Sequence, residues 1–202
     1  MLGNSITDVV HSEINNIYRF SILIYYVEVP EESDMPFEQL EEIQNKYAKL
    51  TSILIEKGIT ISTMESCTSG LIASLLTDID GASKAVKGGF VTYSNEIKIV
   101  CGVPAGVIEE YGVYSKETAK EMAKRCRAAY SSDIGVGVTG LLGTSDPNNK
   151  GSLPGEVYFA IEYNGKVKVM YFNVPDQGSK FMNKVYAAGK ICDELLEMFD
   201  EK

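Results

Sequence analysis

Three short polar clusters contain most of the residues whose chemistry could serve catalysis. They are Glu65-Ser-Cys-Thr-Ser-Gly70, Tyr93-Ser-Asn-Glu-Ile-Lys98, and the pair Thr139-Gly140 with the long loop after it. Each cluster lies at the end of a β-prone segment. In open α/β sheets, ligands gather beyond the carboxyl ends of the strands. We therefore expect the three clusters to converge on one site.

The histidine content restricts what that site could do. The only histidine is His11, in the N-terminal segment, so Ser-His-Asp and Cys-His arrangements are disfavoured. A partly desolvated lysine can lose its proton near neutral pH and deprotonate a serine. Lys98 is therefore a candidate base for Ser66, and the Tyr93 hydroxyl could relay or position a proton.

Each candidate also has a structural interpretation. Ser66 or Thr68 could cap the helix that follows, because hydroxyl side chains are preferred there, although the N–H groups at such a helix start could also hold an oxyanion. Lys98 could be a solvated helix lysine, and Tyr93 a tyrosine at the edge of the core. Cys67 could be a nucleophile, but no cationic neighbour is evident to lower its pKa, which favours a small buried residue.

The elements that must position these clusters follow from apolar periodicity and turn residues. Apolar residues from Phe37 to Leu54 recur at three- and four-residue steps and predict an amphipathic helix that Gly58 ends. Strands are predicted over 59–64, 88–94, 134–139, 156–163 and 166–174, and helical segments over 71–76, 95–98, 115–130 and 179–199. Asn164-Gly165 predicts a hairpin between the last two strands. Alternating strands and helices that end in one hairpin indicate an α/β fold, a three-layer α/β/α sandwich with a mixed sheet.

Residues 1–36 differ from the rest of the chain. A short helix-like pattern and a β-prone run precede Pro30-Glu-Glu-Ser-Asp-Met-Pro36, which is acidic and bracketed by prolines. Such a segment is typical of a linker. We expect a short N-terminal appendage and linker over 1–36 and the main domain over 37–202.

Composition narrows the class of protein. The chain has 202 residues, of which 45% are hydrophobic and 23% charged, as in ordinary globular proteins. With 19 basic and 28 acidic residues the net charge is −9, which argues against a nucleic-acid partner. The four cysteines form no C-x-x-C pair, which indicates free thiols in a reducing compartment. We see no secretory signal and no run long enough for a membrane helix, so we expect a cytoplasmic protein without a membrane partner.

The clusters resemble the motifs of the CinA C-terminal domain family. Besides the first two clusters, the chain carries Gly81-Ala-Ser83, Gly88-Gly-Phe-Val-Thr-Tyr-Ser-Asn-Glu-Ile-Lys98, Gly102-Val103, Tyr111-Gly-Val-Tyr-Ser-Lys-Glu-Thr-Ala119 and Val138-Thr-Gly140, in order over about residues 38–200. Characterised members are nicotinamide-nucleotide amidohydrolases of pyridine nucleotide salvage: they convert nicotinamide mononucleotide and water into nicotinate mononucleotide and ammonia. The resemblance implies a hydrolase with Ser66 as nucleophile, Lys98 as base and Tyr93 as a third catalytic residue.

The resemblance also implies a small-molecule nucleotide as partner, no metal, no cofactor, and a homo-oligomer in which a dimer is favoured. Turn amides near Cys67 and Thr68 could hold the oxyanion. The residues expected to bind substrate are Glu65, Cys67, Thr68, Asn95, Thr139, Gly140 and Lys180.

Three departures from the family pattern concern this substrate site. Ser69 stands where a glycine is usual, and the loop that begins Thr139-Gly140 lacks the usual Gly-Pro. Lys180 stands where an arginine suited to the substrate phosphate is common, and lysine binds phosphate as a point charge without the arginine fork. The alternative hypothesis is therefore a family member that has lost catalysis and acts as a nucleotide-binding or interaction protein.

Overall fold

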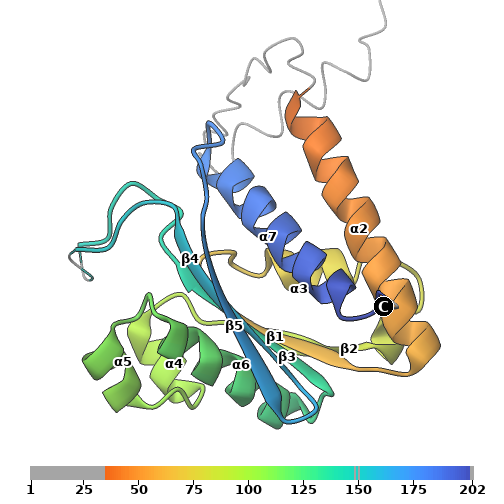
Figure 1. Cartoon of the computed structure of the whole chain (residues 1–202), viewed down its shortest axis with the longest axis horizontal. Coiled ribbons are helices and arrows are strands. Elements are labelled where there is room, and N and C mark those ends of the chain that lie inside the picture. The colour runs from red at the N-terminus through yellow and green to blue at the C-terminus, as the bar shows by residue number, and fades with distance from the viewer. Residues whose placement is uncertain (1–34, 148, 150, 201–202) are drawn as a thin grey trace, which may run out of the picture. The chain divides into compact units, whose positions relative to one another are not determined.

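The described part of the chain is built in three layers. The structure, a computed structural model, describes residues 35–147, 149 and 151–200. Helices α2 (Met35–Lys57), α3 (Leu71–Leu76) and α7 (Lys180–Glu197) cover one face of a central sheet, and α4 (Asn95–Val100), α5 (Ala105–Tyr111) and α6 (Lys116–Tyr130) cover the other (Figure 1). The α/β/α sandwich predicted from the sequence is confirmed.

The sheet is mixed, as the pattern predicted. Its strands are β1 (Ile61–Glu65), β2 (Val86–Val91), β3 (Ile134–Gly140), β4 (Glu156–Tyr163) and β5 (Lys166–Asn173). Their order is β2-β1-β3-β4-β5; β1 pairs in parallel with both neighbours, whereas β4 is antiparallel to β3 and β5. Because β1, β2 and β3 run the same way, their carboxyl ends share one edge of the sheet, and the three polar clusters follow there.

Local sequence signals set several element ends. Ser94, Ser115 and Ser179 each accept a hydrogen bond from the backbone N–H three residues ahead and thereby cap α4, α6 and α7. The β4–β5 hairpin turns at Asn164 and Gly165, whose φ values are 52° and 72°. A type I′ turn requires positive φ at both central residues, which asparagine and glycine tolerate best.

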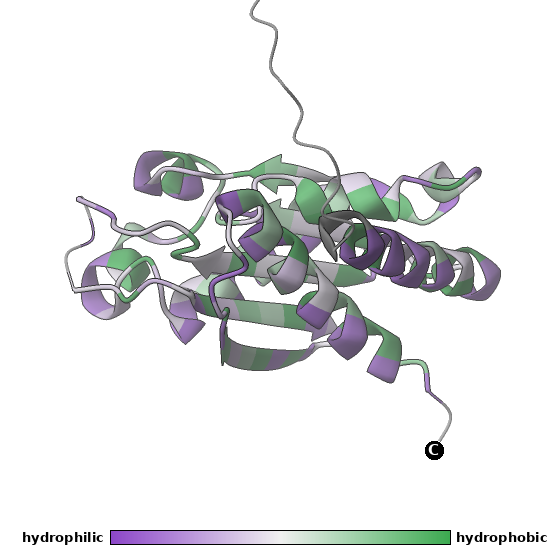
Figure 2. Cartoon of the chain, turned by 90° about the horizontal axis from the view of Figure 1, so that it is seen from above, coloured by the Kyte–Doolittle hydropathy of each residue, from purple (hydrophilic) through white to green (hydrophobic). Residues whose placement is uncertain are grey.

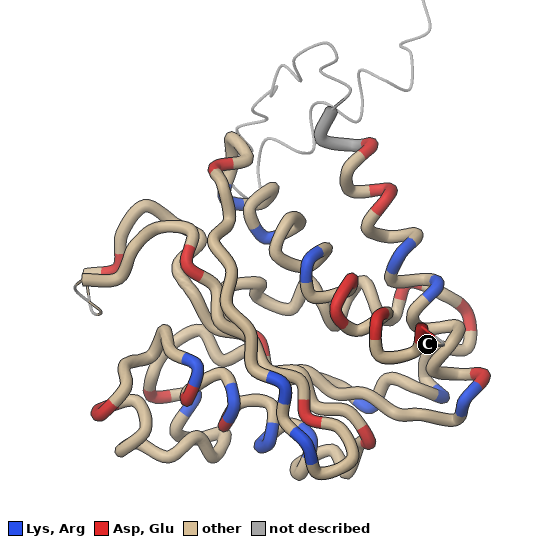
Figure 3. The backbone as a smooth tube through the Cα atoms, viewed as in Figure 1, with Lys and Arg blue, Asp and Glu red and all other residues tan. Residues whose placement is uncertain are grey.

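The main core lies between the sheet and the α2, α3, α7 layer. The α2 residues Tyr47, Leu50 and Leu54 are fully buried, and the Tyr47 hydroxyl donates to the Ala188 carbonyl of α7 at 2.9 Å. Figure 2 shows hydrophobic strands between helices that carry hydrophilic outer surfaces, and Figure 3 shows charged residues gathered mainly on the helices. Burial of one such leucine is worth ~1.5–3 kcal/mol, so this layer holds the sheet in place.

On the opposite face, glycines let α6 approach the sheet closely. A Cβ at Gly137 of β3 would lie 2.3 Å from both the Ala119 carbonyl oxygen and the Ala123 nitrogen of α6. A Cβ at Gly135 would lie 2.2 Å from the Ala123 carbonyl oxygen. These glycines serve helix-to-sheet packing, which explains a glycine-rich strand without a dinucleotide fingerprint.

Some boundaries differ from the prediction. Strand β2 covers Val86–Val91 and not 88–94, because the chain leaves the sheet at Thr92 and Ser94 already caps α4. Helix α5 and a 3-10 turn over Ala82–Lys84 were not predicted. Helix α2 begins at Met35, inside the segment expected to be a linker. Residues 1–34 lie outside the described part, so the predicted appendage stays a prediction.

Candidate active site

The turn after β1 is built around a buried carboxylate. Glu65 is fully buried, and its oxygens accept bonds from the Thr68 hydroxyl at 2.7 Å and from the N–H groups of Gly70, Ile72 and Ala73 at 2.9, 3.1 and 2.8 Å. A buried charge is tolerable when hydrogen bonds replace its hydration. Glu65 thus takes up the N–H groups at the start of α3.

This arrangement corrects the alternative in which a hydroxyl caps α3. The N-cap position is Gly70, with φ of 90° and no side-chain capping bond, and the capping oxygens come from Glu65 instead. Ser69 precedes it with φ of 54°, in the left-handed region that disfavours side chains. The usual family glycine at this position is therefore explained by backbone geometry, and Ser69 adopts the same conformation at a cost of ~1–2 kcal/mol.

Ser66 follows Glu65 directly in the chain, and we call the bonds from Glu65 to Thr68, Gly70, Ile72 and Ala73 the Glu65 clamp. Its N–H donates to the Val138 carbonyl of β3 at 3.0 Å, and its side chain is 4% exposed. Among the described residues, no backbone bond of a turn or loop uses the N–H of Cys67 or Thr68 as donor. Both N–H groups form hydrogen bonds to the Cys67 sulfur, which is a weak acceptor. The two backbone donors that follow Ser66 in the chain therefore face a weak sulfur acceptor and not a backbone oxygen.

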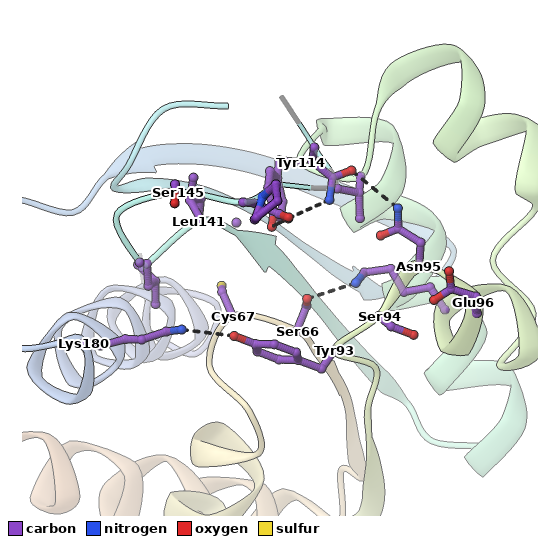
Figure 4. A pocket seen from close by; sticks show the side chains of 18 residues that line it. Ser66, Cys67, Tyr93, Ser94, Asn95, Glu96, Tyr114, Leu141, Ser145 and Lys180 are labelled. Atoms are coloured by element: carbon purple, nitrogen blue, oxygen red, sulfur yellow. Dashed lines mark hydrogen bonds between the residues drawn. The ribbon is translucent and has the colours of Figure 1, made fainter. Parts of the chain in front are cut away.

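Lys98 reaches Ser66 from α4. Its Nζ donates to Ser66 Oγ at 3.0 Å and to the Thr92 carbonyl at 2.8 Å (Figure 4). Lys98 is only 1% exposed, and burial lowers its pKa to about 8 against the opposing charges of Cys67, Asp146 and Glu96. The solvated-lysine interpretation is therefore wrong.

The cause of this low pKa is the desolvation that the sequence analysis named for such a lysine. The positive end of α3 is not the cause, because Glu65 accepts bonds from the N–H groups at that helix start. Desolvation acts most strongly, because it penalises the charged ammonium. A lysine amine with this pKa can accept a proton near neutral pH.

Cys67 is not poised as a nucleophile. Burial raises the pKa of its thiol to about 12, although the Lys98 charge lowers it slightly. The thiolate is the reactive form of cysteine, and at neutral pH this thiol keeps its proton. The structure thus favours the alternative in which Cys67 is a small buried residue beneath the turn.

A cavity of about 400 Å³ opens over the Ser66–Lys98 pair (Figure 4). Of the residues expected to act on or bind substrate, seven line it: Ser66, Cys67, Tyr93, Asn95, Lys98, Gly140 and Lys180. The sequence clusters therefore converge, as expected from their place at one edge of the sheet.

Three residues expected to contact substrate lie beneath this cavity instead. Glu65 and Thr68 are fully buried or nearly so and bind each other in the clamp. Thr139 is also fully buried, and its hydroxyl donates to the Val113 carbonyl at 2.9 Å. These side chains hold the cavity wall in place because their polar atoms are bonded within the protein.

Tyr93 and Lys180 form one end of the cavity. Tyr93 is 61% exposed, and its hydroxyl accepts a bond from Lys180 Nζ at 3.1 Å. The hydroxyl points toward Lys180, away from the Ser66–Lys98 bond (Figure 4). This position suits a wall residue for a substrate ring better than the expected proton relay.

The opposite wall contains residues that the sequence analysis did not identify. Asp146 Oδ2 accepts bonds from the Tyr114 hydroxyl and from Asn149 Nδ2, both at 2.6 Å, and Asn95 Nδ2 donates to Asn149 Oδ1 at 3.4 Å. Tyr114, Asp146 and Asn149 all line the cavity. The only available signal was the polar composition of the loop after β3, and composition does not specify which loop side chain turns inward.

The described residues lack two further kinds of feature. They contain no group of three or more His, Cys, Asp or Glu side chains placed to hold a metal ion. They also contain no helix with the length and apolar character needed to cross a bilayer.

Comparison with known proteins places this site in a recognised family. The model of the CinA C-terminal domain matches residues 43–195. A protein of Bacillus velezensis, provisionally named competence-damage inducible protein, is 41% identical over 155 residues, which are 76% of this chain and 36% of that protein. The chain thus spans about a third of the length of the curated relatives it matches.

Solved structures match over nearly their full length. A crystal structure of a competence/damage inducible protein from Agrobacterium tumefaciens has a TM-score of 0.73 and 28% identity, covering 79% of this chain and 96% of that one. A CinA superfamily protein from Escherichia coli has a TM-score of 0.71 and 26% identity, covering 77% and 90% of the two chains.

Proposed function

The chain belongs to the CinA C-terminal domain family, and on that premise we propose that its cavity hydrolyses the carboxamide of nicotinamide mononucleotide to nicotinate mononucleotide and ammonia. The observation that carries this proposal is the 3.0 Å contact between Ser66 Oγ and the buried Lys98 Nζ. A serine hydroxyl next to an amine of lowered pKa is an activated nucleophile without histidine.

In the first step the neutral Lys98 amine removes the proton from the Ser66 hydroxyl while Oγ attacks the carboxamide carbon. The Thr92 carbonyl accepts one N–H of the amine at 2.8 Å, and rotation about this bond lets the nitrogen lone pair face Ser66. The C–N bond then breaks, and the Lys98 ammonium returns its proton to the departing ammonia. An acyl ester on Ser66 remains.

The negative charge that develops on the carboxamide oxygen needs donors close to Ser66. The N–H groups of Cys67 and Thr68 suit this role, because their acceptor is the Cys67 sulfur, a weaker acceptor than an oxyanion. The N–H groups of Gly70, Ile72 and Ala73 are held by the Glu65 carboxylate instead. A pre-oriented pair of backbone donors can contribute a factor of about 10²–10³ per donor to the rate.

In the second step water attacks the acyl ester. Lys98, neutral again after the release of ammonia, takes a proton from the water and returns it to Ser66 Oγ as the ester bond breaks. Lys180 is the cation placed to hold the phosphate, and its bond to the Tyr93 hydroxyl keeps both side chains at the same end of the cavity.

The test is ammonia release from nicotinamide mononucleotide by the full chain, compared with nicotinamide and an aliphatic amide. We expect release from the mononucleotide that Ser66→Ala abolishes. Lys84→Met, which removes an exposed lysine outside the cavity, is the matched control and should keep full activity. Binding of the mononucleotide without any ammonia release would contradict the proposal and support the non-catalytic alternative.

A further inference from the structure

The cavity wall opposite Lys180 holds a carboxylate in a fixed orientation. Asp146 Oδ2 accepts bonds from the Tyr114 hydroxyl and Asn149 Nδ2, both at 2.6 Å. Asn149 is in turn bonded to Asn95 of α4 at 3.4 Å. Two other segments of the chain therefore help to fix this loop carboxylate in the cavity wall: Tyr114 bonds it directly, and Asn95 bonds it through Asn149.

Two electrostatic effects in this wall involve the Asp146 carboxylate. Burial, followed by the bond to Asp146, raises the pKa of Tyr114, so the phenol stays a neutral donor. The charge also acts across the cavity, because Asp146 is one of the groups that raise the pKa of Lys98. Asp146 is thus close enough to influence a charge at the reacting end of a ligand.

Charges of opposite sign therefore lie on opposite sides of the nucleophile. Lys180 and Tyr93 lie on one side of Ser66, and Tyr114 and Asn95 lie on the other (Figure 4). Such a cavity complements a ligand that carries an anionic group at one end and a cationic ring near its carboxamide. Complementary potentials of this kind govern specificity more than total affinity.

We propose that Asp146, oriented by Tyr114, recognises the positive charge of a pyridinium ring, so that the cavity selects N1-substituted pyridinium carboxamides over the neutral pyridine. This inference rests on the proposed function for the position of the carboxamide at Ser66. It adds the reason for the substrate class: substitution at the ring nitrogen creates the charge that Asp146 recognises.

A purely structural role for Asp146 makes a different prediction. If the carboxylate only held the loop against Tyr114, its loss would weaken all ligands of the cavity by the same factor. If it recognises charge, its loss weakens cationic ligands and leaves neutral ligands of the same shape unchanged.

The experiment measures binding by calorimetry of N1-methylnicotinamide, a permanent cation, and of nicotinamide, its neutral counterpart with the same carboxamide. The wild-type chain should bind the cation about tenfold or more tightly, as one partly buried charge pair allows. Asp146→Asn should reduce this preference to about threefold or less while nicotinamide binding changes by less than about twofold. Glu109→Gln is the matched control, because Glu109 is an exposed carboxylate that does not line the cavity, and it should keep the preference.

Two results would overturn the inference: equal binding of both ligands by the wild-type chain, or an equal loss for both in Asp146→Asn. The first comparison needs no variant and so does not depend on the folding of Asp146→Asn. Ammonia release from the mononucleotide is measured separately. A chain that prefers the cation through Asp146 but releases no ammonia contradicts the proposed function alone, whereas release without the preference contradicts this inference alone.

Discussion

The state of Lys98 should set the pH dependence of turnover. Its pKa is about 8 because the side chain is buried, and the base acts only when neutral. About a tenth of such a lysine is neutral at pH 7 and about nine tenths at pH 9. The value of kcat/KM should therefore rise about tenfold between these pH values, with a midpoint near the lysine pKa.

Two variants separate this explanation from a general effect of pH. Lys98→Arg keeps a positive charge that cannot be removed near neutral pH, so it should lose activity almost as completely as Lys98→Ala, by a factor of about 10²–10⁴. Asp146→Asn removes a charge that raises the pKa of Lys98, so the midpoint should move to lower pH. Cys67 and Glu96 are the other groups that act on Lys98, and both remain in these variants.

The assay is initial-rate ammonia release at low substrate concentration from pH 6 to 10, with protein integrity checked by circular dichroism at each pH. A flat profile between pH 7 and 9 would refute the assignment of Lys98 as a neutral base. So would substantial activity in Lys98→Arg, because a permanently charged group would then suffice and Ser66 would need another base.

Three further variants test the rest of the site. Ser66→Ala should stay folded, since Ser66 caps no helix, and should lose turnover; more than about a tenth of wild-type activity would exclude Ser66 as nucleophile. Lys180→Ala should raise KM for the mononucleotide by about tenfold or more, because a charged hydrogen bond is worth ~1.5–3 kcal/mol. The KM for a phosphate-free analogue should hardly change. Equal effects on both substrates would place the phosphate elsewhere. Glu65→Gln replaces one carboxylate oxygen by an NH2 group, which cannot accept from the backbone N–H that faces it, so urea denaturation should show a loss of ~1–3 kcal/mol in the free energy of unfolding. Glu109→Gln changes an exposed carboxylate and should leave the midpoint unchanged. An unaltered midpoint in Glu65→Gln would show that the clamp adds no stability.

The layer architecture and most elements could be predicted from the sequence because their signals are local. The three- and four-residue spacing of α2 exposes one apolar face whatever lies opposite it, and Asn164-Gly165 specifies its own turn. The serine caps of α6 and α7 need only a backbone N–H three residues ahead. The Ser66 and Lys98 pair was also found, because strand ends in a parallel arrangement meet at one edge of the sheet.

What the sequence could not decide depends on contacts between distant segments. The chain alone suggested a hydroxyl cap for α3, but Glu65 supplies that function because its buried carboxylate lies against the N–H groups of Gly70, Ile72 and Ala73, which replace its hydration. The lowered pKa of Lys98 requires the protein that covers its amine, and no sequence pattern specifies that cover. The orientation of Asp146 depends on Tyr114, which bonds its carboxylate from a segment 32 residues away. Periodicity and turn chemistry are properties of neighbours in the chain, whereas desolvation and side-chain orientation arise only when the folded layers bring separate segments together.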